Sequence, residues 1–97
     1  QHPKSIRNKN DDFRKTFYDR HCVVCNRRGC DPCHIKSKGA GGPDEEWNII
    51  PLCRIHHVEQ HKIGIVTFAK KYQAVENWLL SYGWEIGQKL TRPMPSN

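Results

Sequence analysis

The sequence predicts a small α+β domain that is held together in part by a bound metal ion. Only 36% of its 97 residues are hydrophobic, so we expect one modest core, and cores of this size are commonly supplemented by a metal. The predicted elements run in the order cysteine-containing knuckle, strand, loop, strand, helix, with a further helix at each end. We therefore expect residues 1–97 to form a single domain.

The N-terminal part of the chain is predicted to be a basic arm followed by a short helix. Residues 1–10 are polar and basic without an apolar period, which is typical of a flexible arm. A short helix is expected from Asp11, because Asp11 can cap it and Phe13 and Phe17 fall on one face. At the other end, residues 91–97 contain prolines and are expected to be a loose tail.

Two strands and a helix are predicted in the middle of the chain. Residues 30–37 indicate an extended segment, and Pro32 favours an edge or bulged strand there. The glycine-rich run 39–43 lacks the Gly-Lys-Ser/Thr ending of a phosphate-binding loop, so we expect it to connect two strands. Trp47–Leu52 has the composition of a second strand, and the helix after it should end by Gly64.

A last helix is predicted over residues 67–83. Thr67 can cap it and Gly83 can stop it. Its apolar residues recur at a helical period and are interpreted as core rather than as a base-stacking surface: Phe68, Tyr72, Val75, Leu79 and Tyr82. Trp84 and Ile86 are expected to pack back onto the body of the domain.

The five cysteines and six histidines indicate metal binding rather than disulfide bonds, because the cysteine count is odd and the spacing is short. Cys22-x2-Cys25 and Cys53-x2-His56 can together supply the four ligands of a tetrahedral zinc site. We favour this set because it fixes the start of the helix beside the knuckle. A second set stays open, in which four cysteines bind the zinc ion: Cys22, Cys25, Cys30 and Cys33.

A second metal site is predicted on the helix that follows Cys53. His57 and His61 are four residues apart, so they share one helix face. A neutral imidazole pair at this spacing can hold an ion that keeps positions open for water and substrate. One metal would then stabilise the fold and the other would support chemistry.

The charge balance favours a polyanionic partner. Sixteen Lys and Arg against ten Asp and Glu give a formal charge of +6, and neutralising phosphates drives binding to nucleic acids. The basic residues cluster, and those expected to bind nucleic acid are Arg27, Arg28, Lys36 and Lys38.

No apolar run is long enough to cross a bilayer, and the N-terminus lacks a signal-peptide core. We therefore expect an intracellular protein that is neither secreted nor bound to a membrane.

Three residues on the predicted elements resemble a known family. His34 on the first strand, Asn48 on the second and His57 on the helix, together with the zinc knuckles, resemble the HNH endonucleases. The run from His34 to Gly39 and the run from Trp47 to Cys53 are similar to small phage and prophage members with a structural zinc site. The resemblance covers residues 22–62 and implies a zinc-stabilised ββα-metal core with flanking N-terminal and C-terminal helices.

The resemblance implies metal-dependent hydrolysis of double-stranded DNA, by nicking or by double-strand cleavage. His34 would be the general base, Asn48 would steady the strand pair, and His57 and His61 would bind one divalent cation. That cation is expected to be Mg²⁺, Mn²⁺ or a softer ion such as Ni²⁺ or Zn²⁺. We expect a monomer whose specificity comes from the N-terminal arm, the last helix or a partner protein. If the chain is phage-encoded, it would act in the cytoplasm of a bacterial host.

The chain departs from the family at the residue before the base histidine. Many relatives carry Asp, Glu or His there, as a further ligand to the catalytic ion, whereas this chain has Cys33. A thiolate is a poor ligand for Mg²⁺ and a good one for Zn²⁺. Either Cys33 binds the ion, or Asp31 supplies a carboxylate from the same face of the strand. We lean towards Asp31, acting directly or through water.

Two other functions remain in view. A non-catalytic zinc module that docks on DNA or on a protein needs only the four zinc ligands and the positive charge. A module of this kind does not explain the presence of four further polar residues at their positions: His34, Asn48, His57 and His61. A nuclease that acts on structured RNA is the third interpretation.

Overall fold

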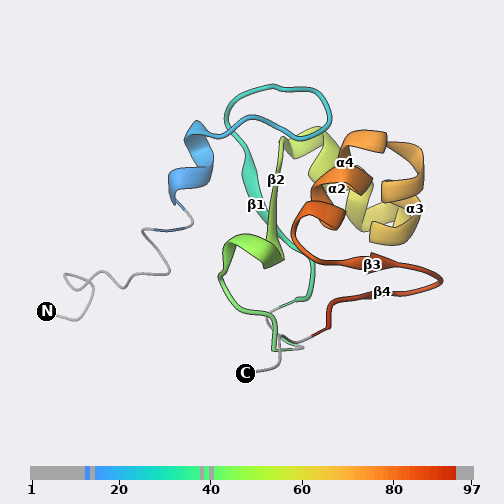
Figure 1. The fold of residues 1–97 in the computed structure, drawn as a ribbon. Helices are drawn as coiled ribbons and strands as arrows, with labels where there is room; N and C mark the ends of the chain where they lie inside the picture. The colour runs from blue at the N-terminus through green and yellow to red at the C-terminus, as the bar shows by residue number, and fades with distance from the viewer. Residues whose placement is uncertain (1–12, 14, 38, 40, 94–97) are drawn as a thin grey trace, which may run out of the picture.

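Two antiparallel strands and one helix form the centre of the computed structural model (Figure 1). β1 spans Asp31–His34 and β2 spans Ile49–Leu52, with His34 opposite Ile49. α2, Arg54–Ile63, is separated from β2 by Cys53 alone and contacts both strands. The predicted small α+β fold is confirmed, with strand, loop, strand and helix in the predicted order.

The structure describes residue 13 and residues 15–37, 39 and 41–93. The predicted basic arm, the helix cap at Asp11, Lys38 and the last four residues of the predicted tail lie outside this part of the chain.

In the N-terminal helical segment Phe13 and Lys15 are α-helical, and a 3-10 turn follows at Thr16–Asp19. Phe17 is fully buried, and the ring of Phe13 lies edge-on to it at 5.5 Å, so the two share one face as predicted. Arg20 ties this segment to the rest of the fold. Its guanidinium lies over the Phe17 ring and donates two hydrogen bonds to the carboxylate of Glu46, at 2.8 and 2.7 Å.

Both central strands are shorter than predicted, and the reason lies in Asn48. Trp47 and Asn48 belong to a 3-10 turn, Glu46–Asn48, so the prediction that Asn48 lies on the second strand was wrong by one residue. The Asn48 side chain is fully buried. It accepts a hydrogen bond from the Lys36 N–H at 2.8 Å, and it donates to the carbonyls of Lys36 at 2.9 Å and Pro43 at 3.0 Å. These bonds replace strand pairing and fasten the two ends of the loop together.

The loop between the strands closes around Asn48 because residue 42 is a glycine. A Cβ atom at Gly42 would lie 1.8 Å from the carbonyl oxygen of Lys36 and 2.8 Å from Nδ2 of Asn48. No side chain can be accepted at those distances without moving the backbone of the loop. The glycine-rich run therefore connects two strands, as predicted, and allows the chain to pass close to Asn48.

The C-terminal helical region consists of two helices, so the prediction of one helix over 67–83 was wrong. α3 spans Ile65–Lys71 and α4 spans Gln73–Ser81. Tyr72 between them is extended, with φ −121° and ψ 111°. The chain turns beyond α4 at Gly83, whose φ of 89° fits the predicted stop.

The break at Tyr72 arises from contacts with α2. The Tyr72 hydroxyl donates a hydrogen bond to Glu59 Oε1 at 2.8 Å. Its ring packs edge-on against His56, with centroids 5.6 Å apart. These contacts outweigh the helical periodicity of the sequence, which is a weak preference compared with tertiary packing.

A short hairpin that the sequence did not predict follows the helices. β3, Glu85–Ile86, pairs with β4, Leu90–Thr91. Trp84 at its start is buried and donates a hydrogen bond from Nε1 to the Trp47 carbonyl at 2.7 Å, so it packs back onto the body as expected.

The apolar core lies between the sheet and the helices and includes Ile50, Leu52, Phe68, Val75 and Leu79. Within the described residues, every helix is too short or too polar to cross a bilayer.

Candidate metal centres and active site

Four predicted zinc ligands converge at the N-terminal end of α2. The ligand atoms of Cys22, Cys25, Cys53 and His56 all lie within 4.8 Å of one another. Cys25 Sγ is 3.7 Å from Cys53 Sγ, and Cys22 Sγ is 3.7 Å from His56 Nδ1. Zinc–sulfur bonds of about 2.3 Å place two tetrahedral ligands about 3.8 Å apart. The cluster therefore has the ligand types and the dimensions of a zinc site.

The backbone of the knuckle turns its first two cysteines towards α2. The Cys22 carbonyl accepts a hydrogen bond from the Asn26 N–H at 2.8 Å, and the Val23 N–H donates to the Pro51 carbonyl at 3.1 Å. Asn26 has a φ of 65°, a left-handed conformation that asparagine tolerates. Burial alone would raise the pKa of the Cys22 thiol, but backbone N–H groups, that of Cys53 foremost, outweigh burial and lower it. A lowered pKa favours the thiolate that binds metal.

Cys30 lies outside both ligand clusters found among the described residues. It is fully buried, and its Sγ donates to the carbonyl of Arg27 at 3.6 Å. Burial raises the pKa of its thiol to about 11, so it is a neutral packing group at ordinary pH. The structure thus separates the cysteines of the alternative four-cysteine set, because Cys33 joins the histidines of the second cluster.

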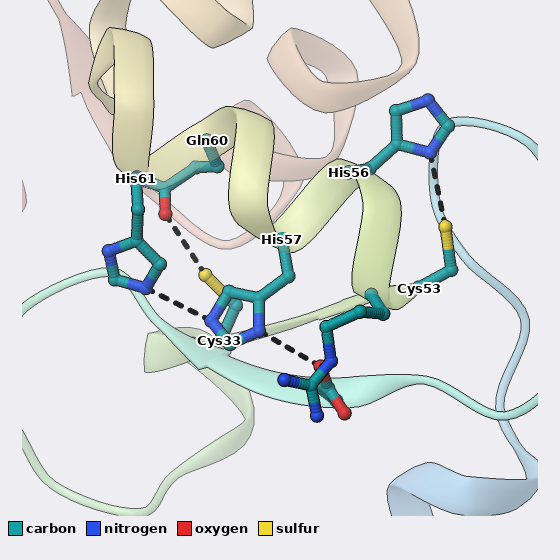
Figure 2. A network of polar contacts seen from close by, with 8 residues as sticks. Cys33, Cys53, His56, His57, Gln60 and His61 are labelled. Atoms are coloured by element: carbon teal, nitrogen blue, oxygen red, sulfur yellow. Dashed lines mark hydrogen bonds and ion pairs between the residues drawn. The ribbon is translucent and has the colours of Figure 1, made fainter.

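The second cluster combines Cys33 from β1 with His57 and His61 from α2 (Figure 2). Their ligand atoms lie within 4.8 Å of one another, and the two histidine Nε2 atoms are 3.0 Å apart. Cys33 is buried, His57 is half-buried and His61 is exposed. The cluster is therefore anchored in the core at one end and reachable from solvent at the other, which is what a site for an exchangeable ligand needs.

The surroundings of Cys33 favour its neutral thiol. Burial raises the pKa of its thiol to about 12, and the charge of Asp31 adds to the effect. The Sγ atom donates a hydrogen bond to Gln60 Oε1 at 3.2 Å. Gln60 is itself buried on α2 and was not predicted to belong to the site. A bound metal would have to displace the thiol proton, which couples metal affinity at this cluster to pH.

Asp31 lies beside the second cluster and not within its set of three. Its Oδ2 atom is 3.1 Å from Nδ1 of His57 and 3.0 Å from Nε of Arg54. This contact occupies the His57 nitrogen that faces away from His61. The other nitrogen, Nε2, faces His61 and can serve with it as a metal ligand.

His34 forms a close pair with a carboxylate that the sequence did not single out. Nε2 of His34 is 2.6 Å from Oδ1 of Asp44, whose side chain is only 1% exposed. Asp44 belongs to the segment between the glycine-rich loop and β2. The spacing of Asp44 from the other site residues did not identify it, because only the closure of the loop brings Asp44 back to the end of β1. A sequence signal for Asp44 was its position two residues after Gly42, in the glycine-rich loop that precedes Asn48.

Three of the four predicted nucleic-acid contacts fall within the described residues. Arg27, Arg28 and Lys36 are exposed. Arg28 is 3.7 Å from Asp19, a solvent-exposed pair that constrains it little. These side chains are therefore free to meet a polyanion.

The zinc assignment predicts different metal contents for two cysteine variants. Cys53→Ala should lose one tightly bound ion and unfold, because structural zinc sites contribute on the order of 10 kcal/mol to folding. Cys30→Ala, the matched control, should keep the ion and lose only about 1–2 kcal/mol of packing. Metal content per chain by mass spectrometry, together with thermal unfolding, measures both. Loss of the ion from Cys30→Ala would instead support the four-cysteine set.

The family HNHc_6, described as "Putative HNHc nuclease", matches residues 4–90 of the 97-residue chain. Searches of the curated proteins and of the solved structures each found no match. The matched range contains both ligand clusters, His34 and Asn48. Because the match covers far more than half of the chain, the chain belongs to this family of HNH nucleases, the family that its motifs resemble.

Proposed function

We propose that this chain is a metal-dependent endonuclease that hydrolyses phosphodiester bonds in DNA. The observation that carries the proposal is the juxtaposition of a base and a metal-binding group on one strand. His34, paired with Asp44, directly follows Cys33, which joins His57 and His61. Membership of an HNH nuclease family supports nuclease activity in general, and the formal charge of +6 favours a nucleic-acid substrate.

His34 would act as the general base. Its contact with Asp44 holds the ring through Nε2, which leaves Nδ1 to accept a proton from the attacking water. A histidine is suited to this step because its ordinary pKa lies near neutrality. The carboxylate of Asp44 would stabilise the imidazolium that forms, in the way that a buried aspartate supports a catalytic histidine in hydrolases.

Cys33, His57 and His61 would hold the catalytic cation. One sulfur and two imidazole nitrogens fit a divalent ion that keeps further positions for water and substrate. When bound, the ion would supply Lewis acidity and neutralise charge on the phosphate. The soft sulfur favours Zn²⁺ or Ni²⁺ over Mg²⁺, which binds oxygen ligands.

Asp31 would position His57 rather than bind the ion itself. Its contact with Nδ1 fixes the tautomer and the orientation of the ring, and Arg54 holds the carboxylate from the other side. Carboxylates that hydrogen-bond to a metal-binding histidine typically change metal affinity about 10- to 100-fold. Asp31 was expected to act on the ion directly or through water, and in this proposal it acts through His57 instead.

The remaining parts of the proposal concern the substrate and the assembly. Arg27, Arg28 and Lys36 would grip DNA phosphates, which positions a duplex without reading its sequence. Zinc at the first cluster would hold the fold together. The chain would act as a monomeric nuclease domain over residues 1–97, with specificity supplied by its ends or by a partner protein.

Replacing His34 should abolish cleavage while leaving both metals bound. Loss of a general base typically lowers the rate by about 10²- to 10⁴-fold. The variants are His34→Ala and His34→Gln, the second of which keeps a hydrogen-bonding group near Asp44. His21→Ala, which removes an exposed histidine outside both clusters, is the control. Relaxation of supercoiled plasmid DNA in Mn²⁺, Ni²⁺ or Zn²⁺ is the measurement. Normal cutting by both His34 variants would refute the assigned base.

Replacing Asp31 should weaken metal binding at the second cluster. Asp31→Asn keeps the size of the side chain but removes the charge that orients His57, so the affinity for Co²⁺ or Zn²⁺ should fall about 10- to 100-fold. Asp19→Asn, an exposed carboxylate far along the chain from the cluster, is the matched control. Calorimetric titration of protein already loaded with structural zinc measures the change. Equal affinities for the two variants would remove Asp31 from the site.

A further inference from the structure

A groove outside both metal clusters lies at the end of β1. It has a volume of about 740 Å³ and is lined by four regions: residues 35–36, Trp47, the α2–α3 junction and the β3–β4 hairpin with Trp84 at its start. The hairpin extends below α3 in Figure 1. Ligand pockets typically measure about 300–1,000 Å³. The apolar wall is formed by half-buried or buried side chains that include Ile35, Trp47, Ile63, Ile65, Trp84 and Leu90. None of the metal-site residues is needed to build it.

The charge of the groove has one sign. Lys36 and Lys89 are exposed and Arg92 is half-buried, and no acidic residue is among the described residues that line the groove. An apolar wall with a cationic rim is complementary to a ligand that carries both aromatic surface and negative charge. A nucleotide chain has this combination, because its bases are aromatic and each of its phosphates is an anion.

The aromatic wall is held rigidly. The indole of Trp84 donates to the Trp47 carbonyl at 2.7 Å, and the two rings are 5.9 Å apart. The Arg92 guanidinium lies 4.3 Å from the centre of the Trp47 ring, and its Nε donates to the Tyr82 carbonyl at 2.7 Å. Aromatic rings and guanidinium planes are the surfaces on which proteins stack unpaired bases. A base inside a duplex is already stacked on both faces, so only an unpaired or extruded base could use this wall.

Residues that line the groove are close sequence neighbours of the proposed active-site residues. Ile35 and Lys36 directly follow His34, and Ile63 lies two residues after His61. We propose that this groove binds unpaired nucleotides of the DNA strand next to the phosphate presented to His34. The preferred substrate would then be a branched or frayed duplex rather than a continuous one. This inference rests on the proposed nuclease function, but binding can be measured without cleavage.

Two comparisons of binding test the groove. The protein is the zinc-loaded His34→Ala variant, and the ligand is a fluorescently labelled single-stranded oligonucleotide. An abasic oligonucleotide of the same length keeps the phosphates and lacks the bases, so it should bind at least about tenfold more weakly. Lys89→Glu should weaken binding to the normal oligonucleotide and reduce the salt dependence by about one phosphate contact. Lys70→Glu, an exposed lysine on α3 that does not line the groove, is the matched control.

The outcomes separate this inference from the proposed function. Equal binding of the normal and abasic oligonucleotides, or equal effects of the two lysine variants, would overturn the groove assignment and leave the groove to another occupant such as a protein segment. Plasmid cleavage by the unmodified chain would stand unaffected by that result. Conversely, base-dependent binding that Lys89→Glu weakens supports the groove, whether or not cleavage is found.

Discussion

The convergence of Cys22, Cys25, Cys53 and His56 is the constraint on which the rest of the structure depends. A zinc ion bound there would join the knuckle before β1 to the first turn of α2 and would keep the helix from sliding or rotating relative to the strand. His57 follows His56 directly, and consecutive helical residues point about 100° apart. Directing His56 to the knuckle therefore directs His57 towards β1. Tyr72 packs on His56, so the position of His56 also sets the position of the break between α3 and α4.

The two clusters that share α2 differ in burial, and each is suited to a different role. The first has two buried cysteines and sits where a small core needs a cross-link. The second is buried at Cys33 and exposed at His61, so an ion there could meet a substrate. Asn48 and Gly42 close the loop that brings Asp44 to His34. His34 and Cys33, neighbouring residues of β1, are thus positioned in different ways: the buried amide of Asn48 closes the loop beside His34, and a zinc ion at the first cluster would fix α2 beside Cys33.

Short-range patterns in the sequence were enough to predict the order of the central elements, the first cluster, the histidine pair of the second and the family, whereas the choice between Cys33 and Asp31 stayed open with a lean towards Asp31. Ligand spacing carries this information because each half of a metal site is commonly a pair of ligands separated by about two to five residues, such as Cys22 with Cys25 or His57 with His61. Features that depend on tertiary contacts escaped prediction. Tyr72 interrupts a segment with good helical periodicity because it bonds to Glu59. Asp44 reaches His34 only after the loop closes, and Asp31 turns to His57 only once α2 is in place.

The most direct test of this account is the metal preference of cleavage by the unmodified chain and by Cys33→Asp. If Cys33 binds the catalytic ion, the unmodified chain should cut plasmid DNA best in soft ions such as Zn²⁺ or Ni²⁺ and poorly in Mg²⁺. Cys33→Asp replaces sulfur by oxygen and should raise the relative rate in Mg²⁺ by about tenfold or more. An identical order of metal preference in the two proteins would contradict the assignment of Cys33, His57 and His61 as one metal site.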